Sequence, residues 1–299
     1  MDLLHHRRAR FPFKTQFLED VSFFLDYVVV VYRAIGEELN DGKHCLAVMQ
    51  LRKDNFELLA EMTFDNMDSA AMTMMEVVGF PERSTFGLCC VLGETSTLSM
   101  IPVSLRIVDG CVQLEKQRIQ QLMSFDDMEL SHPAPLIDVW ASPSKDAKTT
   151  AVIGPTLSIY NARRCCLVGK EILALVEDRI ELHDIRAGLI RKIEYDLSLY
   201  GGGCIIPWGN NCAVLVDHDD DSSSFVIDTQ HQKVREMRLR TEPTDCATIS
   251  KDGMLIVACI PEAENLDSND GREHTVHHGW LAIPPLALLA RRVAETYNY

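Results

Sequence analysis

The stretch Leu182-His183-Asp184, followed by Ile190-Arg191-Lys192-Ile193, recurs 44 residues later as Val226-Ile227-Asp228 followed by Val234-Arg235-Glu236-Met237. The apolar runs before it repeat as well. Residues 204–206 and 212–216 match residues 246–248 and 254–258 at an offset of 42, and residues 169–176 form an earlier copy at an offset of 40. A period of this length is typical of repeat architectures, in which each unit needs its neighbours to bury its apolar face.

The pattern inside each repeat indicates strands. Residues 174–176, 180–182 and 189–193 are short apolar runs, separated by charged or turn-forming pairs. Few longer windows keep a period of 3.6, so the pattern favours strands over helices. The sequence therefore predicts an all-β fold of stacked four-stranded units.

The stretch Ser250-Lys251-Asp252-Gly253 before an apolar run, together with residues 180–190, resembles the blade of a WD-repeat propeller. In that family an S-x-D-G turn precedes a strand that ends in Trp-Asp, and a turn with Gly follows. The resemblance is clearest over residues 160–282 and looser upstream.

This chain departs from the WD pattern at one position of each copy. His183 and Ile227 stand where the family usually has Trp, whereas Asp184 and Asp228 retain the acid. The resemblance therefore implies a divergent WD-like propeller rather than a regular WD40 protein.

The length of the chain fits such a ring. Six or seven antiparallel blades need about 240–310 residues at this period, and the chain has 299. We expect the propeller to span residues 21–283. Asp41-Gly42 and Asp109-Gly110 are expected to form tight hairpins, because Asx-Gly pairs accept positive φ angles. Strands are predicted in the N-terminal half at residues 27–32, 44–51, 56–64, 70–78, 86–91, 97–108 and 111–116.

Three segments lie outside the blade pattern. Residues 1–20 carry the basic run His5 to Arg10 and are predicted to form an arm, either mobile or packed on the rim. Residues 117–130 place Ile119, Leu122 and Met123 on one helical face, which predicts a short helix. Residues 284–299 begin with two prolines followed by good helix formers, and predict a C-terminal helix.

Composition narrows the class of protein. Apolar residues make up 46% of the chain, enough for a sizeable core. No apolar window of about 18 residues lacks charges, so neither a membrane span nor a signal peptide is expected. Several of the ten cysteines lie inside apolar runs, which favours reduced thiols in a cytoplasmic or nuclear protein.

The formal net charge of −15 argues against nucleic acid as the primary ligand, because phosphate contacts need Lys or Arg on the binding face. It favours solubility and basic partner surfaces. The basic run Arg7 to Arg10 is read as solvated, with contact to an acidic partner as the alternative.

Two clusters could hold a metal ion. The tract Asp217 to Asp221 lacks the alternate spacing and distant Glu of a calcium loop, and its Ser-rich flank predicts an exposed turn. His274, His277 and His278 lie beside Glu273, without an HExxH order or paired cysteines. A loop from residue 262 to 278 is the favoured interpretation, so no metal and no cofactor are predicted.

No local motif of catalysis is present. The chain has no G-x-S-x-G elbow, no phosphate-binding P-loop and no dinucleotide-binding glycine fingerprint. We therefore predict no enzyme and no catalytic residue. The leading hypothesis is a protein-protein interaction scaffold or subunit of a larger assembly, whose faces and loops bind a protein partner.

Two alternatives stay open. One is the substrate-recognition subunit of an F-box-type ubiquitin ligase, although residues 1–25 are short for an adaptor-binding module. The other is a propeller enzyme with an active site at the channel mouth. Loop-borne Arg and Trp are common at binding hot spots, which draws attention to Arg186, Arg191, Arg235 and Trp208. Arg191 and Arg235 occupy matching positions of the repeat and are read as decorating exposed strand faces, so no site residue is predicted.

Overall fold

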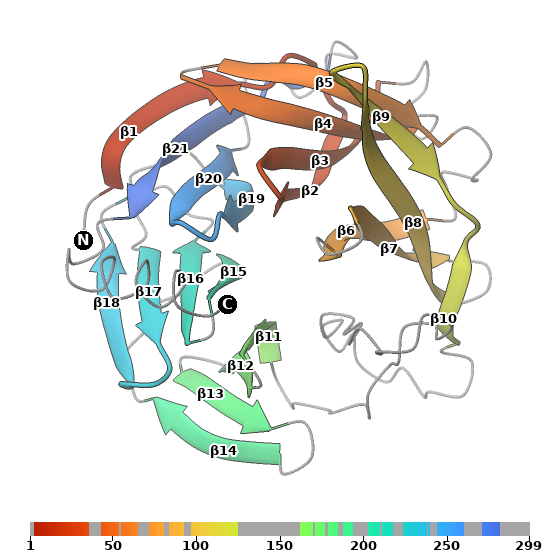
Figure 1. Cartoon of the computed structure of the whole chain (residues 1–299). Coiled ribbons are helices and arrows are strands. Elements are labelled where there is room, and N and C mark those ends of the chain that lie inside the picture. Colours follow the sequence, from red (N-terminus) through yellow and green to blue (C-terminus); the bar gives the residue numbers. More distant parts are fainter. Residues whose placement is uncertain are drawn as a thin grey trace, which may run out of the picture.

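The structure is a computed structural model, and its described residues form an all-β protein without helices. Five antiparallel sheets stand around a common centre (Figure 1). The described residues are 3–35, 43–53, 55–64, 72–80, 84–92, 97–124, 162–169, 171–176, 179–184, 188–193, 203–209, 211–217, 224–237, 239, 244–259 and 271–281.

The first two sheets come from the N-terminal half of the chain. The first sheet has the order β2 (Phe17–Phe24), β3 (Tyr27–Arg33), β4 (His44–Arg52) and β5 (Asn55–Thr63). The second sheet has β6 (Met72–Phe80), β7 (Thr85–Leu92) and β8 (Thr97–Val108). Beyond β8, two strands share the outer position: β9 (Cys111–Lys116) and β10 (Gln120–Ser124).

The third and fourth sheets follow the repeat. The third is β11 (Ala162–Val168), β12 (Glu171–Val176), β13 (Arg179–Asp184) and β14 (Gly188–Ile193). The fourth is β15 (Gly203–Trp208), β16 (Cys212–Asp217), β17 (Ser224–Asp228) and β18 (Lys233–Met237). The 44-residue offset thus relates β13 to β17 and β14 to β18.

The fifth sheet joins the two ends of the described chain. It has the order β19 (Thr244–Ile249), β20 (Met254–Cys259), β21 (Thr275–Leu281) and β1 (Leu3–Arg10). The first strand of each sheet lies toward the centre in Figure 1. There β2 contacts β6 and β19, and β15 contacts β11 and β19.

The core lies between the sheets. Four apolar clusters fill the spaces between neighbouring sheets. They lie between the fifth and first sheets, the first and second, the third and fourth, and the fourth and fifth. Strand β3 shows why the apolar runs are continuous. Val28 and Val30 point into one cluster, while Val29 and Val31 point into the next. A strand buried on both faces has no polar position to alternate with.

Most predicted strands are confirmed. Those expected at residues 44–51, 86–91, 97–108 and 111–116 correspond closely to β4, β7, β8 and β9. The Asp109-Gly110 hairpin is also present, with φ angles of 52° and 79°, which place both residues in the left-handed region that a tight hairpin requires. The Asp41-Gly42 pair and residues 284–299 lie outside the described residues.

Two predictions need correction. The basic arm expected at residues 1–20 contains β1, which pairs with β21 at the outer edge of the fifth sheet, as the packed alternative expected; β2 already begins at Phe17, before the expected start of the propeller at residue 21. The predicted helix at 117–130 is incorrect over residues 120–124, which form β10 and pair with the start of β8; residues 125–130 lie outside the described residues. In both places, pairing with a distant strand determines the local structure.

Among the described residues, no helix has the length and hydrophobicity that crossing a membrane requires.

Candidate functional site

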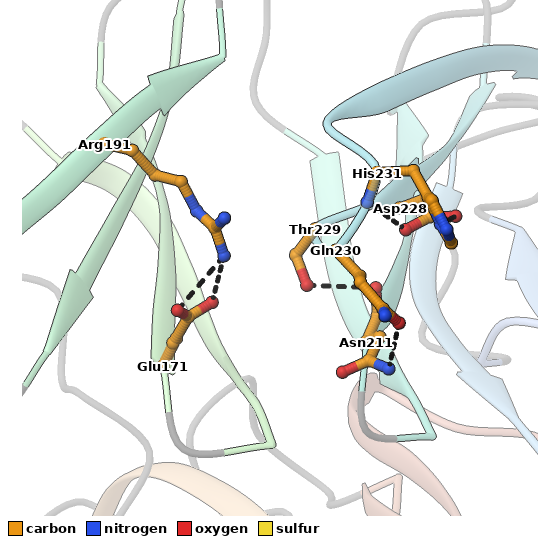
Figure 2. A network of polar contacts seen from close by, with 7 residues as sticks. All are labelled: Glu171, Arg191, Asn211, Asp228, Thr229, Gln230 and His231. Atoms are coloured by element: carbon orange, nitrogen blue, oxygen red, sulfur yellow. Dashed lines mark hydrogen bonds and ion pairs between the residues drawn. The ribbon is translucent and has the colours of Figure 1, made fainter.

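The repeated aspartate has a structural role at the end of β17. The Asp228 carboxylate accepts hydrogen bonds from the backbone N–H of His231 at 2.9 Å and forms a second contact with the His231 ring at 2.9 Å (Figure 2). Partial burial raises the pKa of Asp228, but these hydrogen bonds outweigh it and hold the pKa below its ordinary value. Asp228 thus shapes the β17–β18 turn, which accounts for an acid at this position of the repeat.

The same turn is tied to the neighbouring turn between β15 and β16. The Thr229 hydroxyl donates to the Asn211 carbonyl at 3.0 Å, and the Asn211 side-chain amide donates to Gln230 Oε1 at 2.9 Å (Figure 2). These contacts satisfy polar groups within the turn region. They hold the two hairpins of the fourth sheet together and indicate structural support rather than chemistry.

Of the four Arg and Trp residues singled out in the sequence, the three that the structure describes do not form one surface. Arg191 donates to both carboxylate oxygens of Glu171, at 3.1 and 2.9 Å, and links β14 to β12 across β13 (Figure 2). Arg235 is exposed on β18, and Trp208 is buried in the core between the fourth and fifth sheets. Arg186 lies outside the described residues.

A buried carboxylate lies at the centre of an ion cluster in the third sheet. Glu181 on β13 contacts His183 Nε2 at 3.0 Å, Arg179 Nε at 3.0 Å and Lys192 Nζ at 3.4 Å. Burial raises the pKa of Glu181, but the hydrogen bonds and charges of His183 and Lys192 outweigh it and hold the pKa below its ordinary value. An ionised Glu181 held by Arg179, Lys192 and the His183 ring forms a structural polar cluster.

The histidines considered for metal binding do not converge. His277 and His278 lie next to each other on β21, so their side chains point to opposite faces of the fifth sheet. The favoured interpretation, a loop from 262 to 278, is wrong from Thr275 onward, where β21 begins. His274 lies before the strand and contacts the Thr15 hydroxyl at 2.8 Å. Within the described ranges, no group of three or more His, Cys, Asp or Glu side chains could hold a metal ion.

A groove between the first and second sheets is the feature that the sequence did not reveal. It has a volume of about 260 Å³ and lies where the outer strands β5 and β9 meet. Ile107, near the end of β8, is 62% exposed, and Leu58 on β5 is 40% exposed. The lining residues of this β5–β9 groove are Tyr27, Gln50, Arg52, Leu58, Leu59, Ile107, Gly110, Cys111 and Val112.

Ion pairs flank the apolar part of the groove. Arg52 pairs with Glu57 beside the groove, and Arg106 pairs with Glu115 on the neighbouring hairpin at 3.1 Å. The arrangement of an apolar centre with charged surroundings is typical of protein contact sites. The one signal in the sequence was the apolar pair Ile107-Val108 immediately before the Asp109-Gly110 turn, where polar residues are usual.

Comparison with known proteins gives no relative: no family model matches the chain, and no curated protein matches it.

Proposed function

We propose that this protein is a divergent WD-like β-propeller of six or seven blades that acts as a protein-protein interaction module in the cytoplasm or nucleus. The five sheets around one centre support this architecture, since their first strands contact one another in series. The pairing of β1 with β21 also supports it. A ring whose last blade takes a strand from the start of the chain has its ends fastened together.

The observation that carries the interaction role is the β5–β9 groove. Ile107 is 62% exposed near the end of β8, and it lines the groove together with Leu58, which is 40% exposed. Both side chains leave apolar area in contact with water. Burying such area contributes about 25 cal/mol per Å², and clustered exposed apolar side chains mark contact sites. The occupant is an apolar side chain or short apolar segment of a partner protein.

The experiment places a photoreactive benzoylphenylalanine at Ile107 and, as a control, at Leu4. Leu4 is 50% exposed on β1, so the two probes are similarly accessible but lie on different sheets. Irradiation in cells of the source organism should give a discrete adduct from position 107. A Leu58→Asp substitution in the same chain should abolish this adduct.

Three results would count against the groove. They are no adduct from position 107, equal adducts from positions 107 and 4, and an adduct that persists with Leu58→Asp. An adduct with twice the mass of the chain would identify a second copy as the occupant and would overturn the proposed partner protein. Circular dichroism of each variant confirms that the fold is intact.

A further inference from the structure

An exposed phenylalanine lies beside two arginines at the start of β2. Phe17 is 40% exposed, and the guanidinium carbons of Arg33 and Arg272 each lie 5.6 Å from its ring centroid. Cation–π contacts of this kind hold a charged group and an aromatic face together in water. Aromatic residues and arginine are also the residue types that most often contribute to binding energy in interfaces.

Three separate chain segments hold this arrangement. Thr15 and Arg272 exchange two backbone hydrogen bonds, at 3.0 and 2.7 Å, and the N–H of Gln16 donates to the Arg33 carbonyl at 2.8 Å. Gly271 has a φ of 74°, and a Cβ there would overlap the side chain of Ile35. The backbone therefore positions the arginines beside Phe17 before any ligand arrives, which reduces the ordering cost of binding.

Among the described residues around Phe17, positive charge exceeds negative charge. Arg10 and Lys14 share one carboxylate, Glu273, at 2.8 and 3.9 Å, and Arg33 pairs with Glu19 at 3.5 Å. With Arg272, the described part of this region holds four cations and two carboxylates, a difference of +2 among those residues, on a chain whose net charge is −15. The apolar side chain of Ile35, 43% exposed, borders the same region. We call Arg10, Lys14, Phe17, Arg33, Ile35 and Arg272 the Phe17 patch.

We propose that the Phe17 patch binds an acidic segment of a partner protein. The carboxylates of that segment pair with Arg10, Lys14 and Arg272, and an apolar side chain between them packs on Phe17 and Ile35. The charge of the chain selects this ligand, because an acidic partner is repelled from most of the surface and attracted to a locally positive site. Nucleic acid is disfavoured, since it needs an extended basic track along the phosphate backbone.

The test uses fluorescence anisotropy with a fluorescein-labelled peptide of Glu and Leu, and a matched peptide in which Lys replaces each Glu. The acidic peptide should bind the intact protein, and added salt should weaken the binding. The Lys peptide should not bind. Phe17→Ala should weaken binding about tenfold, as loss of a hot-spot aromatic does. Arg272→Gln, which keeps the backbone bridge to Thr15, should weaken it about threefold.

The matched control is Arg106→Gln. Arg106 has a 66% exposed side chain in an ion pair on the second sheet, so this substitution removes the same charge elsewhere and should leave peptide affinity unchanged. Lys14→Gln provides a second patch variant should Phe17→Ala lower the melting temperature. It should weaken binding about twofold.

Absence of binding to the acidic peptide would overturn the proposal, as would affinity that all three patch variants leave unchanged. Tighter binding of a labelled oligouridylate than of the acidic peptide would replace the protein partner with RNA. The Phe17 patch does not depend on the β5–β9 groove: Ile107→Asp should leave peptide binding unchanged. Phe17→Ala should likewise leave the adduct from position 107 unchanged, so the two proposals fail separately.

Discussion

The stability of the protein should fall as the pH is lowered through the range where free histidine titrates, and His274 should cause much of that loss. The His274 ring is almost fully buried and lies between the Thr15 hydroxyl, 2.8 Å from Nε2, and the Cys259 carbonyl, 3.2 Å from Nδ1. Nδ1 therefore donates to the carbonyl, and Nε2 accepts from the hydroxyl. Burial lowers the pKa of His274 from 6.5 to about 4.

The sign follows from proton uptake. Between pH 6.5 and about 4 the unfolded chain binds a proton at His274 and the folded protein does not, so acid favours unfolding over this range. About pH 5 lies roughly 1.5 units below the pKa of the unfolded state, and each unit is worth about 1.4 kcal/mol. The free energy of unfolding should therefore fall by about 2 kcal/mol between neutral pH and about pH 5 from this residue.

The assay is urea unfolding of the wild type and of His274→Gln at both pH values, followed by tryptophan fluorescence. The variant should be less stable at neutral pH, and its loss of stability on acidification should be about 2 kcal/mol smaller than that of the wild type. His5→Asn is the control, since His5 is exposed on β1 and has a φ of 55° that Asn accepts. Equal acid sensitivity of His274→Gln and the wild type would refute the reasoning.

Three further substitutions test the packing. Gly279→Ala places a Cβ 3.2 Å from backbone atoms of β1, so urea unfolding should show a free energy of unfolding that is lower by about 1–2 kcal/mol. No loss of stability would contradict the pairing of β1 at this position. Leu182→Ala empties a fully buried site between the third and fourth sheets. The same assay should show a free energy of unfolding that is lower by about 3–5 kcal/mol, and a loss below about 1 kcal/mol would contradict this packing. Glu181→Gln removes the carboxylate that Arg179, Lys192 and the His183 ring contact, and should cost about 1–2 kcal/mol at neutral pH. Because the pKa of Glu181 is lowered, the difference from wild type should shrink as the pH falls below 4.5, and a constant difference would contradict the ion cluster.

The sequence predicted the strands whose residues are almost all apolar. Strands β3, β4, β16 and β20 are continuous apolar runs because both faces of each are covered by neighbouring sheets. The turn at Asp109-Gly110 was equally readable, since two consecutive positive φ angles restrict the residues that fit. Each of these signals lies within about ten residues of the structure it specifies.

The predictions that needed correction concern segments whose structure depends on pairing with another strand. β1 has a basic sequence with little apolar alternation, and its structure depends on β21; the ring of His6 bonds to that of His277, 271 positions away. In β10, the spacing of Ile119, Leu122 and Met123 matched a helix, but pairing of residues 120–124 with β8 prevailed. The β5–β9 groove left only the apolar pair Ile107-Val108 as a signal in the sequence, and the Phe17 patch was not predicted, because each is assembled from segments that meet only in the folded chain.

Charged side chains on the outer strands discourage pairing with strands of other molecules. An outer strand exposes unpaired backbone groups, and charged side chains discourage further strand pairing. β18 presents Lys233, Arg235 and Glu236, and β1 presents the run from His5 to Arg10. Exposed apolar side chains also lie at Ile107 near the end of β8, and at Leu189 and Ile190 on the outer strand β14. At the β5–β9 groove, where these two strands contact each other, a partner meets side chains such as Ile107 and Leu58.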